Sequence, residues 1–108
     1  MLRAIAERNG IHTADVADVI WGTSAQIGAQ SGDLGRMAAL DAGYDVRSSG
    51  VTLDRYCGSG ITSVAFAAAQ VMSGMEELVV AGGTEMLARP RSRGGRGAPL
   101  MDSGKLRL

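Results

Sequence analysis

Residues 54–62, with the sequence DRYCGSGIT, contain the side chain in this protein that is best suited to nucleophilic chemistry. Cys57 is the single cysteine of the chain, and glycines stand at positions 58 and 60. A cysteine thiolate is a strong nucleophile, and neighbours without side chains let a large substrate approach the sulfur. A lone cysteine can equally be a small buried hydrophobe, so the elements around it must decide between the two roles.

The segments on either side of Cys57 predict that it lies between a strand and a helix. Residues 50–53 favour a strand, and from Ile61 apolar residues recur with the period of a helix that ends at Ser73 and Gly74. These apolar positions are 61, 64, 65, 68, 71 and 72. Unpaired N–H groups and the positive dipole at a helix start favour an anion, and can lower the pKa of a cysteine below its usual value of about 8.5. The position therefore favours a reactive Cys57.

The other predicted elements indicate an α/β protein. The apolar run 78–81 is followed by Gly82 and Gly83, as expected for a buried parallel strand that completes a strand–helix–strand unit. Trp21, at the end of an earlier strand, is predicted to be a core residue. In chain order the earlier elements are a helix ended by Gly10, a short turn over 13–17, a strand over 18–22, an irregular loop over 23–35 and a helix over 35–42.

The length and composition predict one small soluble domain at most, or part of a larger one. The chain has 108 residues, of which 45% are apolar and 16 are glycine, about twice the usual share of ~7%. The net charge is zero, but residues 1–88 hold five arginines against ten acidic residues, and residues 89–108 hold six basic residues against Asp102. One cysteine excludes an internal disulfide and leaves no second thiol for a metal site. Glu7 and Arg8 interrupt any signal sequence, and no apolar run reaches the roughly 20 residues of a membrane span, so we expect a cytoplasmic protein.

The central region resembles the nucleophile region of the thiolase family, the acyl-CoA C-acyltransferases. The family pattern is a strand, a Cys-x-Ser-Gly turn, an alanine-rich helix and a strand ending in Ala-Gly-Gly-x-Glu-x-Met. This chain has VTLDRYCGSGITSVAFAAAQVMSG and then ELVVAGGTEML, and DVIWG, RMAALDAG and GRGAPLMDSGKLRL follow the family order. The resemblance implies a partial N-terminal thiolase domain over residues 1–88, with a mixed, largely parallel sheet and a buried alanine-rich helix. Residues 89–108 would begin a basic loop region, and the C-terminal thiolase domain would be absent.

The resemblance implies acyl transfer between CoA thioesters and CoA. Cys57 is then the catalytic nucleophile that attacks an acyl-CoA and holds the acyl group as a thioester, with its own backbone N–H in the oxyanion hole. Coenzyme A takes the acyl group in thiolytic cleavage of a 3-oxoacyl-CoA, and the α-carbanion of a second acyl-CoA takes it in Claisen condensation. Acyl-CoA and CoA are substrates here, and neither a bound cofactor nor a metal is implied. The intact family also implies a homo-oligomer.

Several groups that the family uses have no counterpart in this sequence. The family's catalytic histidines, in Gly-His-Pro and Asn-Glu-Ala-Phe-like segments, and its second cysteine belong to the C-terminal half. The family also begins with a central strand before its first helix. We therefore expect a fragment with little or no activity alone. The only histidine, His12, matches no catalytic position and is expected at the surface, and Asp54 stands where the family often has asparagine.

Two rival functions come from other parts of the chain. RPRSRGGRG, residues 89–97, resembles RNA-binding arginine–glycine segments. In a thiolase, arginines at this place could meet the CoA phosphates, with no single arginine assigned, and the simplest alternative is a solvated basic loop. The acidic body and the lack of Phe or Tyr in that run favour the thiolase interpretation. A chain that only associates with partners could carry Met72, Met75 and Met86 on a dimer surface, although methionines at helical spacing are more typical of a core. Glu85, in a glycine-bounded turn, is predicted to be structural rather than a general base.

Overall fold

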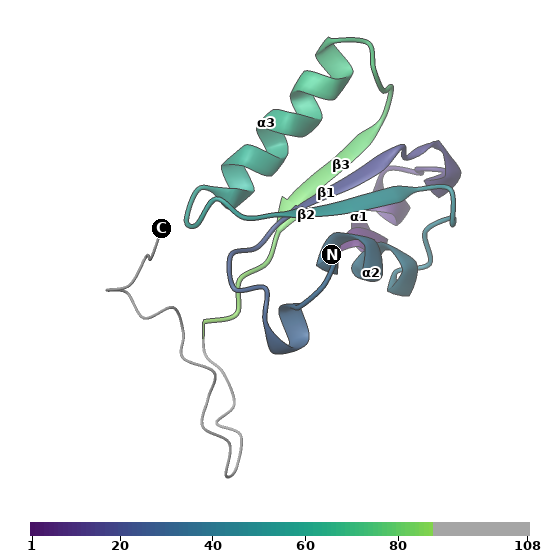
Figure 1. The fold of residues 1–108 in the computed structure, drawn as a ribbon. Coiled ribbons are helices and arrows are strands. Elements are labelled where there is room, and N and C mark those ends of the chain that lie inside the picture. Colours follow the sequence, from purple (N-terminus) through teal and green to yellow (C-terminus); the bar gives the residue numbers. More distant parts are fainter. Residues whose placement is uncertain (88–108) are drawn as a thin grey trace.

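The computed structural model describes residues 1–87. A small sheet lies between helices, with α3 on one face and α1 and α2 on the other (Figure 1). In chain order the elements are helix α1 (Leu2–Arg8), the 3-10 turn η1 (Thr13–Asp15), strand β1 (Asp18–Gly22), the 3-10 turn η2 (Gly28–Gln30), helix α2 (Leu34–Asp41), strand β2 (Ser49–Leu53), helix α3 (Ser59–Met72) and strand β3 (Val79–Gly83). The predicted α/β class is confirmed.

The three strands are parallel and run in the order β2-β1-β3. Residue Gly22 at the end of β1 is paired with Leu53 of β2 and with Gly83 of β3, so all three strands end at one edge of the sheet. β1 has the predicted bounds, and β2 and β3 overlap the predicted strands. Because loops after parallel strands gather at this carboxyl edge, residues far apart in the chain meet there.

The described sheet has a central strand, β1. β1 is hydrogen-bonded on both sides, and its residues Val19, Ile20 and Trp21 are buried. The expectation that this sheet lacks a central strand is therefore wrong for the described residues, because β1 itself occupies the centre and pairs directly with both neighbours.

The hydrophobic core lies between the sheet and helices α1 and α2. It joins apolar residues of both helices to the central strand, as its members show: Leu2, Ala6, Val16, Val19, Trp21, Ala39, Tyr44 and Val80. Trp21 is a core residue, as predicted, and its Nε1 donates to Thr84 Oγ1 at 3.1 Å. The Tyr44 hydroxyl donates to the Leu2 carbonyl at 2.9 Å and fastens α1 to the body, and burial raises the pKa of Tyr44.

Two glycines allow backbones to approach more closely than any other residue would permit. A Cβ on Gly22 would lie 2.6 Å from the backbone carbon and oxygen of Ser59, at the start of α3. A Cβ on Gly83 would lie 2.7 Å from the carbonyl oxygen of Gly22. The end of β1 is therefore in direct backbone contact with α3 on one side and with the end of β3 on the other.

Helix α3 covers the sheet with its small polar face rather than with its apolar stripe. The buried residues are Ser59, Thr62, Ser63 and Ala67. The apolar stripe predicted from the period faces away, with Ile61 78% and Met72 87% exposed. The expectation of a buried helix thus holds only for the face on the sheet. Burial of the polar face costs little because the Ser63 hydroxyl has partners, 2.8 Å from the Gly60 carbonyl oxygen and 2.9 Å from that of Gly82.

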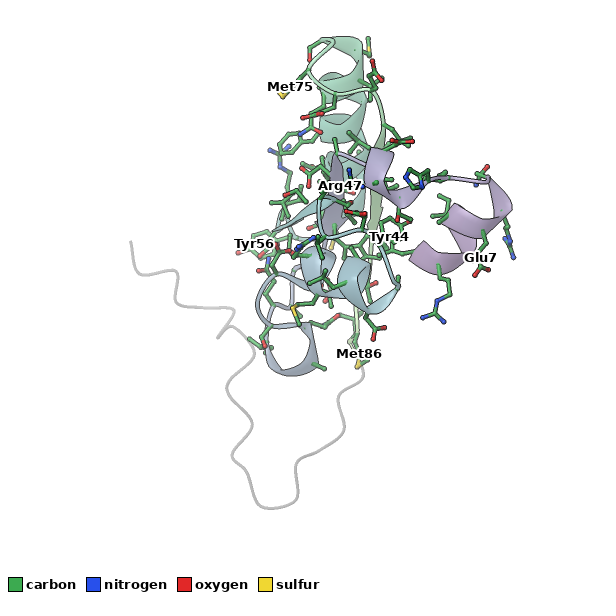
Figure 2. All side chains as sticks on the ribbon, turned by 90° about the vertical axis from the view of Figure 1, so that its right-hand side faces the viewer. Glu7, Tyr44, Arg47, Tyr56, Met75 and Met86 are labelled. Atoms are coloured by element: carbon green, nitrogen blue, oxygen red, sulfur yellow. The ribbon has the colours of Figure 1, made fainter. Side chains whose placement is uncertain are left out.

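The three methionines singled out in the sequence are all exposed. Met72, Met75 and Met86 are 87%, 70% and 47% exposed, so the prediction that they fill a core is wrong. Figure 2 shows Met75 and Met86 at opposite ends of the described molecule, so these two do not share one local patch.

None of the helices in residues 1–87 has the length and the apolar run that crossing a bilayer requires.

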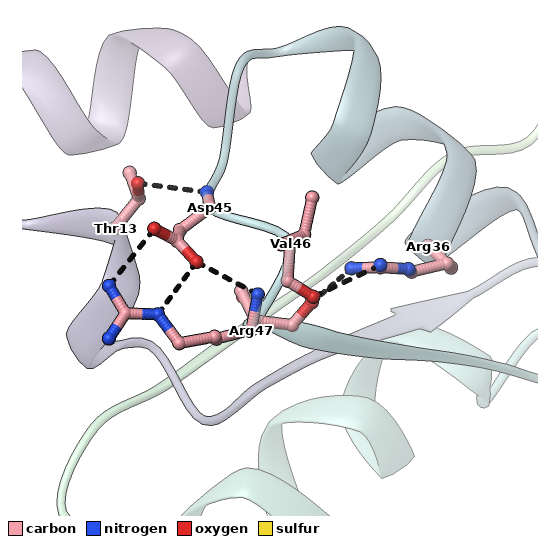
Figure 3. A network of polar contacts seen from close by, with 6 residues as sticks. Thr13, Arg36, Asp45, Val46 and Arg47 are labelled. Atoms are coloured by element: carbon pink, nitrogen blue, oxygen red, sulfur yellow. Dashed lines mark hydrogen bonds and ion pairs between the residues drawn. The ribbon is translucent and has the colours of Figure 1, made fainter.

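A polar network holds the connection between α2 and β2 (Figure 3). The carboxylate of Asp45 accepts hydrogen bonds from the backbone N–H and the guanidinium of Arg47, each at 2.9 Å to Oδ1, and the Asp45 N–H donates to Thr13 Oγ1 at 3.1 Å. From α2, the guanidinium of Arg36 donates to the Val46 carbonyl at 3.2 Å. Hydrogen bonding from Arg47 lowers the pKa of Asp45 to about 2.

Replacing Gly22 by alanine should destabilise the fold. The new methyl group would overlap the Ser59 backbone, and relieving such overlap costs roughly 1–3 kcal/mol. Urea unfolding measures the loss. Gly60→Ala is the matched control, since a Cβ there has nothing within 4 Å and should leave stability unchanged or raise it. An equal loss of unfolding free energy in the two variants would contradict the close contact between Gly22 and Ser59.

Replacing Asp45 by asparagine should lower stability near neutral pH and have no effect in strong acid. The folded pKa of about 2 lies below the ordinary value of 3.8, so the carboxylate contributes fully above that ordinary value. The contribution is lost as the pH falls through about 2. Thermal melts of both proteins across this range measure the difference, with Asp41→Asn as a control for the altered charge. A difference that stays constant down to the lowest pH would argue against the Asp45–Arg47 contact.

Candidate active site

Cys57 lies on the turn between β2 and α3, as predicted. The turn follows the end of β2 at Leu53, and α3 begins at Ser59 with Gly58 as its cap residue. The cysteine is exposed, so the alternative of a buried hydrophobe is excluded in this structure. Its place at the carboxyl edge of a parallel sheet is where ligands bind in α/β proteins.

The residue before Cys57 has a strained backbone. Tyr56 has a φ of 46°, and it is the only described residue other than glycine with a positive φ. A left-handed conformation costs a non-glycine residue roughly 1–2 kcal/mol. Strain of this kind gathers at functional turns and persists only where surrounding contacts hold it.

Hydrogen bonds inside the turn hold this strained conformation. The Arg55 N–H donates to Ser59 Oγ at 2.7 Å, and that hydroxyl in turn donates to the Tyr56 carbonyl at 2.7 Å. The Tyr56 N–H donates to Asp54 Oδ1 at 2.8 Å. An asparagine side-chain oxygen could accept the same bond, so the aspartate at position 54 keeps the local hydrogen bonding that the family's asparagine would allow.

Two N–H groups at the start of α3 are already paired. The Gly58 N–H donates to the Arg55 carbonyl at 2.9 Å, and the Ser59 N–H donates to the Tyr56 carbonyl at 3.2 Å. The expectation of unpaired donors at this helix start is therefore wrong for these two groups, which close the turn instead. The dipole of α3 still points its positive end at the turn that carries Cys57.

A pocket of about 750 Å³ surrounds Cys57, a volume that suits a small-molecule ligand. Its walls come from three loops at the carboxyl edge of the sheet, within residues 22–27, 54–60 and 83–87. Apolar side chains of Ile27, Tyr56 and Leu87 line it together with Ser24 and Cys57. The sequence identified the second and third segments by their motif, but predicted only an irregular loop for the first. The sequence signal that could have identified the first segment is the glycine at the end of β1, which matches the glycine at the end of β3.

Glu85 has the structural role that its glycine-bounded turn predicted. Its carboxylate accepts the backbone N–H of Ser24 at 2.9 Å and that of Ala25 at 3.2 Å, so the segment after β3 holds the loop after β1. The hydrogen bond from the Ser24 N–H is the main cause that lowers the pKa of Glu85, which keeps the carboxylate charged. Sequence reasoning missed Ser24 and Ala25, because no local pattern marks them as partners of Glu85.

His12 lies far from Cys57 along the strand direction. It caps the turn η1, which precedes the amino end of β1, whereas Cys57 follows the carboxyl end of β2. The imidazole is exposed, as expected. Residues 1–87 also contain no group of three or more His, Cys, Asp or Glu side chains that could hold a metal ion. The site in residues 1–87 therefore contains an exposed cysteine and no histidine.

The fold and this site define a parallel α/β domain that presents a cysteine on the turn between β2 and α3. A family described as "Thiolase, N-terminal domain" matches residues 1–98 of the sequence. The chain belongs to the thiolase family, and the resemblance drawn from the sequence is confirmed.

Individual thiolases are similar over most of the chain. The steroid 3-ketoacyl-CoA thiolase FadA6 of Mycobacterium tuberculosis is 40% identical over 87 residues, which cover 81% of this chain and 21% of that protein. The beta-ketoadipyl-CoA thiolase of Acinetobacter baylyi is 39% identical over 89 residues, covering 82% and 22%. The crystal structure of the Bacillus anthracis acetyl-CoA acetyltransferase superposes with a TM-score of 0.70 at 33% identity, covering 89% of this chain and 25% of that one. The chain thus spans about a fifth of the length of the curated relatives it matches.

Replacing Ser59 by alanine should loosen the turn that carries Cys57. The change leaves the Arg55 N–H without its acceptor and removes one donor from the Tyr56 carbonyl, at a cost of roughly 1–3 kcal/mol in unfolding free energy. Urea unfolding measures the effect. Ser73→Ala removes an exposed hydroxyl at the other end of α3 and should cost clearly less. A Ser59→Ala variant as stable as the wild type would show that the turn holds itself without this hydroxyl.

Proposed function

We propose that Cys57 is the acyl-accepting nucleophile of a thiolase-type acyltransferase. One observation carries the proposal: the sulfur is exposed in a pocket, on a strained turn at the start of α3. A nucleophile on such a turn can attack a substrate that lies in the pocket, while the turn keeps the nucleophile in place. The names of the similar proteins, which are thiolases and an acetyl-CoA acetyltransferase, support the same chemistry for this chain.

The proposed reaction has two acyl transfers. In the first, in the cleaving direction, the Cys57 thiolate attacks the 3-oxo carbonyl of a 3-oxoacyl-CoA: the bond from Sγ to that carbon forms, the bond from that carbon to the α-carbon breaks, and the α-carbanion takes up the proton that Cys57 lost and leaves as acetyl-CoA. In the condensing direction, the thiolate attacks the thioester carbonyl of an acyl-CoA, the bond from that carbon to the CoA sulfur breaks, and CoA leaves as a thiol with that proton. In the second, the thiolate of free CoA attacks the Cys57 thioester, or the α-carbanion of a second acyl-CoA does so in the condensing direction. Cys57 leaves as a thiolate in both cases.

The turn and α3 would stabilise the charge that develops in these steps. Each attack places negative charge on the former carbonyl oxygen, and a backbone N–H aimed at it is a preorganised donor. We assign this role to the N–H of Cys57, next to the positive end of the α3 dipole.

The substrate class follows from the pocket and the relatives. Ile27, Tyr56 and Leu87 present apolar surface that suits an acyl chain or the pantetheine arm of CoA. Thioesters of 3-oxoacids are the substrate class that the names of the similar 3-ketoacyl-CoA thiolases indicate. The arginines of residues 89–97, proposed to meet the CoA phosphates, lie outside the described residues, as does the basic loop region 89–108.

A complete catalytic cycle needs groups beyond those of residues 1–87. A base must take the Cys57 proton and an acid must return one, and His12 lies at the wrong end of the sheet. We propose that the 108-residue chain accepts an acyl group but completes few turnovers, and that the partial N-terminal domain over residues 1–88 works with the domain that longer thiolases add. A homo-oligomer in the cytoplasm, where CoA thioesters and a free thiol are compatible with a reducing environment, is part of the same proposal.

Incubation of the 108-residue chain with acetoacetyl-CoA should acylate Cys57. Intact-mass and peptide mass spectrometry locate the adduct, and we expect it to form about tenfold faster on folded protein than on the same chain in urea. With free CoA present, little acetyl-CoA should form beyond the one equivalent that acylation of Cys57 releases.

The Cys57→Ser variant, which lacks the thiol and keeps the shape, is the control for this experiment. An adduct of equal yield in Cys57→Ser, or equal acylation rates in the folded and unfolded chains, would overturn the proposal. An inert thiol would favour a protein that associates with partners without catalysis.

A further inference from the structure

Glu85 lies on a different element from Cys57, yet one side chain connects the two. The Ser24 hydroxyl oxygen is 2.9 Å from Glu85 Oε2 and 3.3 Å from the carbonyl oxygen of Tyr56. The single proton of this hydroxyl is shared between the two acceptors as a three-centre hydrogen bond, in which the shorter contact to the charged carboxylate is the stronger. Glu85 therefore determines where the Ser24 hydroxyl lies beside the Tyr56 carbonyl.

The Tyr56 carbonyl is covalently coupled to the Cys57 N–H. Both belong to one planar peptide unit, so a rotation that moves the carbonyl oxygen moves the N–H with it. Because Tyr56 is in the left-handed region, its backbone stays there only while neighbouring contacts hold it. Three contacts with the carbonyl supply that restraint: two come from within the turn, from the N–H and the hydroxyl of Ser59, and one comes from outside it, from the Ser24 hydroxyl.

The segment that carries Glu85 is itself anchored on both sides. The Thr84 N–H donates to the Gly22 carbonyl at 3.0 Å, which extends the pairing of β1 and β3 by one residue. On the other side, the Met86 N–H donates to Gln30 Oε1 at 2.8 Å, and Gln30 is buried. The backbone of Glu85 is therefore held between two anchored neighbours.

We infer that Glu85 is a positioning residue that orients the Tyr56–Cys57 peptide, and with it the N–H facing the developing oxyanion, through the Ser24 hydroxyl. The inference rests on the proposed function of Cys57. Glu85 acts by orientation and transfers no proton, because both of its oxygens are engaged by donors of Ser24 and Ala25. A glutamate of the thiolase pattern thus acquires a role in acyl transfer without touching the nucleophile.

Two reactions of Cys57 separate orientation of this N–H from general loosening of the site. Acylation by acetoacetyl-CoA passes through an oxyanion, whereas alkylation by iodoacetamide displaces iodide and forms none. Glu85→Gln should slow acylation of the full chain by about tenfold or more, as expected when an oxyanion donor is misplaced. Alkylation should change far less, so the ratio of the two rates falls. Ser24→Ala should lower the same ratio, and adding Glu85→Gln to it should lower the ratio little further, because both changes break one link.

Glu77→Gln, which removes an exposed carboxylate ahead of β3, is the matched control and should leave the ratio unchanged. Circular dichroism identifies variants that do not fold, and Ser24→Ala decides the question if Glu85→Gln is among them. A ratio equal to that of the wild type in the folded variant would overturn the inference while leaving Cys57 as the nucleophile. A wild-type chain that is not acylated would overturn the proposed function itself, and the inference with it.

Discussion

The pocket around Cys57 depends on the backbone contact between Gly22, at the end of β1, and Ser59, at the start of α3. At 2.6 Å from a notional Cβ, the contact leaves room for no side chain, so the end of β1 can press directly on the first turn of α3. Gly83 makes a similar approach to Gly22 from β3. The ends of the three strands therefore lie side by side at one edge of the sheet, and the loops that follow them line one pocket.

The turn that carries Cys57 shows how local strain and tertiary contacts work together. The left-handed Tyr56 is unfavourable alone, and the hydroxyl of Ser59 and the carboxylate of Asp54 offset part of its cost from within the turn. Ser24 adds a contact from outside, and Glu85 holds Ser24. These contacts fix the backbone on either side of Cys57, and a fixed backbone is what a preorganised site requires.

Periodicity and glycine placement predicted the elements well but not their orientation. The strand at 18–22 and the strand-to-helix junction at Cys57 are as expected, because alternation, β-branched residues and terminal glycines act over a few residues. The apolar stripe of α3 was expected to be buried, yet Ile61 and Met72 are exposed and Ser63 faces the sheet. A period shows which residues share a helix face, whereas packing density and available partners decide which face is covered.

The sequence by itself determined the family, the α/β class and the place of Cys57 between a strand and a helix, since these follow from short-range sterics and a contiguous motif. Only the tertiary structure decided the exposure of α3, the three-walled pocket and the link from Glu85 through Ser24 to Tyr56. Ser24 and Glu85 are 61 residues apart, and their contact exists because parallel pairing of β1 with β3 brings both strand ends to one edge. Such a contact depends on register and on close backbone approach at glycine, which no local stretch of residues specifies.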